Sequence, residues 1–410
     1  MTYDVAVVGA GPAGIAAARA LAGSELSVIV LEARDRVGGR AHTVEAGGYA
    51  LDLGCGWLHS CDENPLSGLA EASGVELDHT PPPWDRQAFD HEFSSADQAA
   101  FREASAAFDE RVAQMAALPE DPPANAAFEP DARWNPLINA ISGYLNGAAF
   151  DAVSLKDYAA YRDTERNARA PTGYGALIAG LATGLDIRLG WPVERIDRTG
   201  DPIVLTGPGG SVEARSVIVT VPTDILTEGR LAFDPPLPDK GEAADGLPLG
   251  LANKVHFLLD GAGEFPPDSQ LLGRTDRAET CAYHLRPFGR PMIELFGGGA
   301  LAVALDAEGP GALEAFGREE LARLLGSAFP KRLTTLTETR WKSDPWSRGA
   351  YSYARPGRQP ARAELARPVE DRIFFAGEAC SEAFFGTAHG AWIEGERAAR
   401  EVMAALGQGG

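Results

Sequence analysis

Three glycines near the start of the chain have the spacing of a phosphate-binding turn. They are Gly9, Gly11 and Gly14, with Pro12 and Ala13 between the last two. A Gly-x-Gly-x-x-Gly run between a strand and a helix allows a tight turn, close approach of the backbone to a pyrophosphate, and close packing of the helix on the sheet. Free N–H groups and the dipole at the start of that helix favour negative charge. The chemistry that this spacing predicts is the binding of a dinucleotide.

The elements around this turn support that interpretation. Residues 5–8 and 26–31 are short apolar runs, typical of parallel strands buried on both faces, and residues 15–21 between them are rich in alanine. Glu32 closes the second run, 18 residues after Gly14. A carboxylate at this place accepts hydrogen bonds from a ribose in dinucleotide-binding folds. A chance glycine-rich turn followed by a surface glutamate is the alternative, and it would not bring all four elements into register.

The next segment distinguishes between kinds of dinucleotide. Residues 32–40 read Glu-Ala-Arg-Asp-Arg-Val-Gly-Gly-Arg, which resembles the E-x-R-x-R-x-G-G-R signature of the flavin-containing amine oxidase superfamily. Nicotinamide dehydrogenases do not generally carry this extension. The resemblance implies FAD as the cofactor, with contacts from Glu32, Ala33, Arg34, Gly38, Gly39 and Arg40. The guanidinium of Arg40 is a planar fork of donors, which suits the oxygens of a pyrophosphate.

The C-terminal part resembles the closing motif of the same superfamily. It reads Phe-Phe-Ala-Gly-Glu at 374–378 and Gly-Thr-Ala-His-Gly-Ala-Trp at 386–392. The resemblance implies that Glu378 holds the ribityl or pyrophosphate region and that a helix beginning near Gly390 directs its positive end at the flavin. The valine of Pro-Val-Glu-Arg-Ile, residues 192–196, matches a residue whose backbone faces the adenine. The further FAD contacts implied in this way are those of Gly377, Glu378, Thr387, Ala388 and Val193.

Four residues are implied as catalytic by the resemblance. Lys254, in Ala-Asn-Lys-Val-His-Phe, matches a lysine that the family holds near flavin N5 through a water and that assists reoxidation by dioxygen; a solvent-facing strand lysine is the alternative. Tyr351 matches one wall of the aromatic cage that guides the amine, and Thr387 stands where other members have the second cage tyrosine. His59, after Trp57, matches a histidine that lines the substrate channel of polyamine oxidases, although a structural role for it stays open.

Two departures from monoamine oxidases refine the expectation. Ala350 stands where those enzymes carry a cysteine bonded to the flavin, so we expect non-covalent FAD. Thr387, together with the segments around His59 and His389, places the chain nearer to polyamine-oxidase-like bacterial members. We expect His389 to orient the backbone at the start of the last helix.

The reaction that the resemblance implies is oxidation of a C–N bond of a primary or secondary amine. A neutral amine gives a hydride to flavin N5, water hydrolyses the imine, and dioxygen is reduced to hydrogen peroxide. An L-amino-acid oxidase, a desaturase or an isomerase on the same scaffold stays open. An α-carboxylate would need an arginine in the pocket, and Arg162, Arg166 and Arg286 are candidates. A flavin-bound partner protein without turnover is a more distant alternative.

The elements that must position these residues are divided along the chain. Residues 81–180 begin with three prolines and then show apolar residues at helical spacing, which predicts a mostly helical insertion. Short strands alternating with Pro/Gly turns from 233 to 298 predict a second sheet. We expect an α/β fold with a discontinuous Rossmann-like FAD-binding domain and an α+β substrate domain of mixed sheet and helices. The FAD-binding domain would comprise residues 1–80, 186–240 and 335–410, and the substrate domain residues 81–185 and 241–334.

Composition narrows the class of partner. The chain has 410 residues, and Lys+Arg 37 against Asp+Glu 58 gives a net charge of −21. Such a chain repels phosphate backbones, so we expect no nucleic-acid partner, whereas an acidic field favours the approach of cations or serves solubility. Four cysteines make neither a disulfide framework nor a zinc-binding pattern. No long apolar run or leader segment is recognisable, so we expect a cytoplasmic protein without a membrane span.

Overall fold

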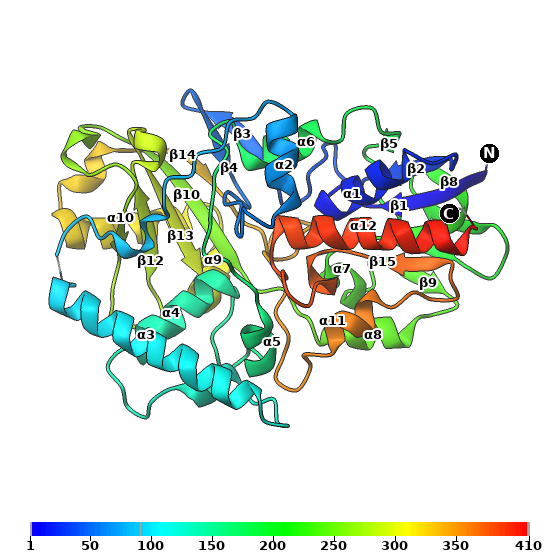
Figure 1. Cartoon of the computed structure of the whole chain (residues 1–410). Helices are drawn as coiled ribbons and strands as arrows, with labels where there is room; N and C mark the ends of the chain where they lie inside the picture. Colours follow the sequence, from blue (N-terminus) through cyan, green and yellow to red (C-terminus); the bar gives the residue numbers. More distant parts are fainter. Residues whose placement is uncertain (1, 91, 408–410) are drawn as a thin grey trace.

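The computed structural model describes residues 2–90 and 92–407, and most strands of this part form two large sheets. The first sheet has eight strands in the order β5-β2-β1-β8-β7-β6-β9, with β15 also paired to β8 (Figure 1). Its strands are β1 (Thr2–Val8), β2 (Val28–Leu31), β5 (Ile187–Arg188), β6 (Arg195–Asp197), β7 (Ile203–Gly207), β8 (Gly210–Val219), β9 (Ala232–Asp234) and β15 (Ile373–Phe375). Strands β5, β2, β1, β8 and β15 run parallel, so their carboxyl ends meet at one edge.

Helices cover both faces of this sheet. Helix α1 (Pro12–Leu21) and the C-terminal helix α12 (Ala388–Ala405) lie side by side on one face, as Figure 1 shows. A Cβ on Gly395 of α12 would lie 2.1 Å from the carbonyl oxygen of Ala13, so this glycine lets the two helices approach. The second face packs against α7 (Thr223–Thr227), α8 (Pro238–Asp245) and α11 (Ala361–Ala366). Burial on both faces explains why β1 is an unbroken apolar run.

The second sheet is antiparallel, with the order β11-β12-β13-β10-β14. Its strands are β10 (Ala252–Leu259), β11 (Ser269–Leu272), β12 (Cys281–Leu285), β13 (Met292–Gly298) and β14 (Leu333–Glu338). Side chains alternate between the two faces of a strand. Val255 and Phe257 of β10 and Leu295 of β13 therefore belong to a core that also includes helix α10 (Ala312–Leu325). Lys254 and Glu294 point to the opposite face.

The remaining elements surround the second sheet and connect the two sheets. Helices from the middle of the chain lie below the second sheet in Figure 1, and the long α3 forms the outer edge. The remaining helices and strands are α2 (Pro65–Ala72), α3 (Ser95–Ala116), α4 (Asn135–Leu145), α5 (Leu155–Ala160), α6 (Tyr174–Gly180), α9 (Gly299–Glu308), β3 (Thr43–Ala46) and β4 (Tyr49–Asp52). Short 3-10 helices lie at Pro83–Asp85, Ala124–Ala127, Ala262–Glu264, Pro287–Gly289, Phe329–Arg332 and Glu378–Cys380.

The division of the chain between the two sheets differs in detail from the expected domain limits. The expected boundary between residues 334 and 335 falls inside β14, which pairs with β10 of the second sheet. Strand β9 and helix α8, residues 232–245, pack with the first sheet, close to the expected limit at residue 240. The domain limits themselves remain a prediction.

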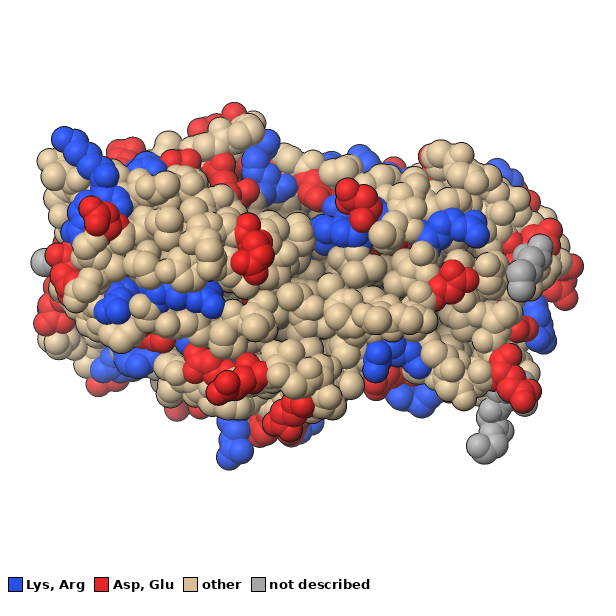
Figure 2. Space-filling view, turned by 90° about the horizontal axis from the view of Figure 1, so that it is seen from above, with Lys and Arg blue, Asp and Glu red and all other residues tan. Residues whose placement is uncertain are grey.

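The surface and the helices add two observations. Basic and acidic side chains are interspersed on the face shown in Figure 2, so the excess of carboxylates does not form a single acidic field there. In the part of the chain that the structure describes, the helices are too short or too polar to cross a lipid bilayer.

Candidate active site

A cavity of about 1590 Å³ extends from the carboxyl edge of the first sheet to the polar face of the second. Its lining includes Val8 at the end of β1, Gly377 after β15, and Lys254 of β10. Ligand pockets in proteins usually have volumes of about 300–1,000 Å³. This cavity is therefore large enough for a dinucleotide and a second, smaller molecule. Clefts at the carboxyl ends of parallel strands are also the usual ligand sites of such sheets.

The glycine-rich turn forms an open cradle at one end of this cavity. Gly11 has an ordinary φ of −76°, and the nearest atom to a Cβ built on it is Cα of Gly39, 4.0 Å away. Gly11 is also the N-cap of α1 and provides no side-chain cap for its first turn. Open space, free N–H groups and a helix N-terminus together suit a pyrophosphate. A dinucleotide therefore fits these residues.

Two of the predicted glycine contacts shape the backbone and do not line the cavity. A Cβ on Gly14 would lie 1.9 Å from the carbonyl oxygen of Gly9, so Gly14 lets α1 pack against the turn. Gly38 has a φ of +95° and its N–H donates to the Ala10 carbonyl at 2.8 Å. Their contribution to a bound cofactor would be indirect. The predicted cofactor residues that do line the cavity are Gly9, Gly11, Pro12, Ala13, Glu32, Ala33, Arg34, Gly39, Arg40, Val193, Gly377, Glu378, Thr387 and Ala388.

The acidic residue at the end of β2 is buried beside the turn. The carboxylate of Glu32 accepts hydrogen bonds from the backbone N–H of Ala10 at 2.6 Å and of Arg34 at 2.8 Å. The guanidinium of Arg34 binds both carboxylate oxygens of Asp344, at 2.8 and 2.7 Å, and the Ser347 hydroxyl at 2.7 Å. The Arg34 side chain thus holds the segment around Asp344 against the cradle. Its predicted contact with the cofactor would have to come mainly from its backbone.

A buried carboxylate organises the opposite side of the cradle. Glu378 accepts hydrogen bonds from Ser352 N at 3.1 Å, Ser352 Oγ at 2.7 Å and Gly386 N at 2.9 Å, and it pairs with Arg40 Nη1 at 3.0 Å. Burial acts to raise the pKa of Glu378, but the charges of Arg40 and Arg362 and these hydrogen bonds outweigh it and hold the pKa below its usual value. The carboxylate is therefore ionised and fixes Arg40, whose side chain is 25% exposed at the cavity.

The same network continues to an ion pair that sequence reasoning missed. Arg362 Nη1 donates to Ser352 Oγ at 3.0 Å, and the guanidinium binds both oxygens of Asp157 at 2.6 and 2.7 Å. Both side chains of this pair are almost completely buried. The network joins α5, from the helical region, to α11 and the cofactor side of the cavity. No local pattern indicates it, because the two residues are 205 positions apart.

Lys254 is buried and lines the cavity, so it is not a solvent-facing strand lysine. Its Nζ lies 3.2 Å from the carbonyl oxygen of Asp52 and 3.4 Å from Oε1 of Glu294. Its backbone N–H donates to Thr339 Oγ1 at 2.7 Å. The ammonium is thus held from both sides at the wall of the cavity.

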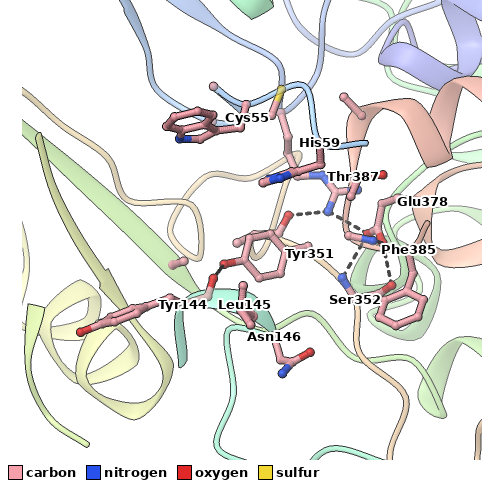
Figure 3. Close-up of a pocket in the computed structure, with 18 of the residues that line it drawn as sticks. Cys55, His59, Tyr144, Leu145, Asn146, Tyr351, Ser352, Glu378, Phe385 and Thr387 are labelled. Carbon is pink, nitrogen blue, oxygen red and sulfur yellow. Dashed lines mark hydrogen bonds and ion pairs between the residues drawn. The ribbon is translucent and has the colours of Figure 1, made fainter. Parts of the chain in front are cut away.

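The other three predicted catalytic residues line the same cavity, and Figure 3 shows Tyr351 in the centre of the view with His59 and Thr387 above it. The hydroxyl of Tyr351 donates to the carbonyl oxygen of Tyr144. Burial raises the pKa of Tyr351, so its phenol stays protonated. His59 Nδ1 lies 2.8 Å from Asn167 Oδ1. Burial lowers the pKa of His59, against the raising effect of Asn167, so its imidazole is neutral at neutral pH.

Thr387 has a second function at the start of α12. Its hydroxyl oxygen accepts a hydrogen bond from Gly390 N at 3.0 Å, which makes Thr387 the N-cap of α12. The hydroxyl group also donates a hydrogen bond to the Phe384 carbonyl oxygen at 2.6 Å. His389 is buried in the first turn, in tilted contact with Phe384 at 4.9 Å between ring centroids.

Replacing Thr387 by alanine is expected to lower the free energy of unfolding by about 1 kcal/mol, because the helix loses its cap. The same change is expected to weaken flavin retention, because this cap fixes the helix N-terminus at the cavity. Chemical denaturation and the ratio of bound flavin to protein measure the two effects. Ser94→Ala, which removes the N-cap of α3, is the matched control and should affect stability alone. Equal flavin content in the Thr387→Ala and Ser94→Ala variants would show that Thr387 acts only as a helix cap.

Aromatic residues that sequence reasoning did not single out form part of the cavity wall. Trp84 is 49% exposed, and its ring centroid lies 5.6 Å from that of Trp57 and 6.1 Å from that of His59. The Arg169 guanidinium covers the Trp57 ring at 4.7 Å and is neutralised by Asp78 and Asp268. Trp84 follows three prolines and lies in a short 3-10 helix, and no local sequence pattern indicates that it reaches the cavity.

The three arginines that the sequence offers for binding an α-carboxylate lie outside the cavity lining. Arg162 and Arg166 pair with the surface carboxylates Glu63 and Asp62, and Arg286 donates to the carbonyls of Phe265 and Gly289. These three arginines do not line the cavity within the described residues. The arginines that do line it are Arg34, Arg40, Arg102 and Arg230.

Carboxylates also line the cavity at its exposed margin. Asp163 and Glu165 lie near Asn167 and are exposed, and Asp109 lies on α3. Residues 2–90 and 92–407 contain no group of three or more His, Cys, Asp or Glu side chains arranged to hold a metal ion.

The chain is similar in sequence and in structure to known flavin-dependent enzymes. The model of the flavin containing amine oxidoreductases matches residues 12–403. Polyamine oxidase 2 of Arabidopsis thaliana is 31% identical over 97% of this chain and 87% of its own length. Polyamine oxidase 4 of Oryza sativa subsp. japonica is 33% identical over 97% of this chain and 88% of its own length. The structure of a putrescine oxidase bound to putrescine superposes with a TM-score of 0.80 at 25% identity, covering 98% of this chain and 99% of that one. The predicted α/β fold class is confirmed.

Proposed function

The chain belongs to the flavin-containing amine oxidoreductase family, and from this premise we propose that it is an FAD-dependent amine oxidase. Its substrate would be a primary or secondary amine, with polyamines as the first class to test. FAD, when bound, accepts a hydride from the α-carbon of the amine and passes the electrons to dioxygen. The observation that carries the proposal is that the open glycine cradle, Lys254 and Tyr351 line one continuous cavity.

The residues of the cradle would hold the cofactor without a covalent bond. Gly11 and Gly39 leave room for the pyrophosphate, Glu32 would accept from a ribose, and the backbone of Val193 would face the adenine. The ion pair of Arg40 and Glu378 would bind the ribityl and pyrophosphate region. The N-terminus of α12, without an acidic residue in its first turn, would present its positive end to the flavin ring.

The substrate side of the cavity favours an amine over an α-amino acid. Tyr351 and Trp84 offer aromatic faces, and the ring quadrupole of such faces attracts cations. Asp163 and Glu165 add negative charge at the margin, whereas His59 is neutral and adds none. An amine carrying a second cationic group suits this distribution of charge. The polyamine oxidases and the putrescine oxidase to which the chain is similar support the same class of substrate.

An assay of hydrogen peroxide across polyamines, aryl-alkylamines and L-amino acids tests this function. We expect peroxide from amines, with diamines and polyamines turned over best, and none above background from amino acids. Peroxide from amino acids alone would contradict the proposal and favour the amino-acid oxidase. Turnover without peroxide, supported by an artificial acceptor, would instead indicate a dehydrogenase that passes its electrons to another acceptor.

Non-covalent binding makes a separate prediction. Ala350 lies beside the cradle, and its carbonyl accepts from Arg40, but its methyl side chain cannot bond to the flavin. Acid precipitation of the yellow protein is therefore expected to leave a white pellet and to release all the flavin as FAD, which chromatography of the supernatant identifies. A pellet that stays yellow would show a covalent link from a different residue, and released FMN would contradict the dinucleotide.

A further inference from the structure

Two residues beside Lys254, the half-buried Glu294 and the buried His256, form a chain of contacts with it. Glu294 on β13 lies opposite His256 on β10, and Lys254 is two residues from His256 on the same face. Glu294 Oε1 is 3.4 Å from Lys254 Nζ, and Oε2 is 3.0 Å from His256 Nε2. His256 Nδ1 is in turn 2.7 Å from Thr337 Oγ1 on β14. Sequence reasoning identified neither Glu294 nor His256 as part of the site.

Two partners and partial burial restrain the Glu294 carboxylate, whose side chain is 21% exposed. A carboxylate inside a protein is costly unless it is paired and hydrogen-bonded, and here each oxygen has its own partner. Burial acts to raise the pKa of Glu294, but the charge of Lys254 and the hydrogen bond from His256 outweigh it and hold the pKa well below its usual value. Glu294 is therefore an anion whose carboxylate cannot turn away from Lys254 without leaving His256.

The ammonium of Lys254 keeps donors for the cavity. Of its three N–H groups, one donates to the carbonyl oxygen of Asp52 at 3.2 Å, whereas the contact with Glu294 at 3.4 Å is an ion pair. Cys55 and the carboxyl of Asp52 also face this ammonium, and burial raises the pKa of each of these two groups. The titratable groups around Lys254 and Glu294 are Asp52, Cys55, His256 and His284.

We propose that Glu294, held in place by His256, is a positioning residue whose opposite charge fixes the Lys254 ammonium at the wall of the cavity. The inference rests on the proposed function, because it concerns the group that would act on dioxygen. Reduction of dioxygen to hydrogen peroxide takes up two electrons and two protons, and negative charge develops on the way. A fixed cation at the wall of the cavity stabilises this charge without having to reorganise. Without Glu294 the same lysine would lack the opposite charge that fixes its position.

The charge-neutral variant Glu294→Gln tests this in the flavin-bound protein. The flavin is reduced with dithionite, so the test needs no amine substrate, and its reoxidation by oxygenated buffer is followed from pH 6 to pH 11. The loss of an opposite charge at about 4–6 Å is expected to move the alkaline midpoint of the rate down by about 1–3 pH units. The pH-dependent change in the visible spectrum of the oxidised, bound flavin should move with it, which is a readout independent of turnover.

Three further variants separate a positioning role from a structural one. Glu294→Asp keeps the charge and should return the midpoint towards that of the unaltered protein. Glu294→Gln in a Lys254→Met background should move nothing further. Glu320→Gln removes a buried carboxylate hydrogen-bonded to Tyr283 and Thr280, outside the cavity, and should leave the midpoint unchanged. If Glu294→Gln loses its flavin, the same measurement is made on His256→Ala. We expect the alkaline midpoint of its reoxidation rate to move in the same direction by a smaller amount.

Two results would overturn the proposal: an unchanged midpoint in Glu294→Gln, or a shift that persists without Lys254. Failure of the proposed function gives a different result. In that case amines would not reduce the flavin of the unaltered protein, although dithionite would reduce it and air would reoxidise it.

Discussion

Lys254→Met is expected to slow reoxidation of the reduced flavin by dioxygen about 100-fold while the flavin stays bound, a loss typical of removing one preorganised electrostatic group. Methionine keeps the length and the apolar stem of the side chain, so the wall of the cavity keeps its shape. The change removes the cation that lies 3.4 Å from Glu294 and 3.2 Å from the Asp52 carbonyl. Reduction by amine should change far less, because no acid–base residue is needed for hydride loss from a neutral amine.

Stopped-flow mixing of the reduced protein with oxygenated buffer measures this rate. Because methionine leaves Glu294 without its cation, the double variant Lys254→Met/Glu294→Gln is the companion that restores charge balance. Lys331→Met, at an exposed lysine outside the cavity lining, is the matched control and should behave like the unaltered protein. If Lys254→Met is reoxidised as fast as Lys331→Met and the unaltered protein, Lys254 does not act on dioxygen.

Gly11→Ala is expected to weaken FAD binding about 100-fold, or roughly 2.7 kcal/mol, with little effect on the folded chain. Gly11 has a φ of −76°, which any residue adopts, and an added Cβ would meet only the Cα of Gly39 at 4.0 Å. The methyl group would instead occupy the space in front of the turn, where the pyrophosphate must approach the backbone. The cost of alanine for glycine at an N-cap is somewhat below about 1 kcal/mol, because alanine caps less well than glycine.

Two other glycine-to-alanine variants serve as controls for Gly11→Ala. Gly14→Ala should damage the fold itself, because its Cβ would lie 1.9 Å from the Gly9 carbonyl oxygen. Gly180→Ala, on α6 with no atom within 4 Å of the added Cβ, should change neither folding nor flavin content. Equilibrium dialysis gives the affinity for FAD, and circular dichroism gives the folded state. A Gly11→Ala protein that binds FAD as tightly as the unaltered chain would show that the pyrophosphate lies elsewhere.

Contiguous motifs explain why much of the cofactor side could be predicted. The turn around Gly11 needs specific backbone geometry over six residues, and such geometry leaves a local pattern of glycines. The family resemblance drawn from residues 32–40 and from the C-terminal motif is confirmed by the match over residues 12–403. The roles given to individual residues remain predictions, and the side chain of Arg34 shows the limit of such reasoning. Its partner Asp344 lies 310 positions away.

Contacts between residues far apart in the sequence could not be predicted, because they depend on how the strands pair. Glu294 meets His256 only because β10 and β13 pair in one register, and a shift of β13 by one residue would turn Glu294 to the other face. The first residues of some helices and strands also differ from those that the sequence predicts. In the insertion expected to be mostly helical, the longest helix begins at Ser95, because Ser94 caps it, and the strand expected from residue 26 begins at Val28.

The most direct test of the central claim is anaerobic addition of amines to the flavin-loaded protein, followed at the absorbance of the oxidised flavin. We expect a polyamine or other amine to bleach the flavin, and air to restore the colour with release of one hydrogen peroxide per flavin. If none of the amines bleaches a flavin that dithionite reduces and air reoxidises, the protein is not an amine oxidase.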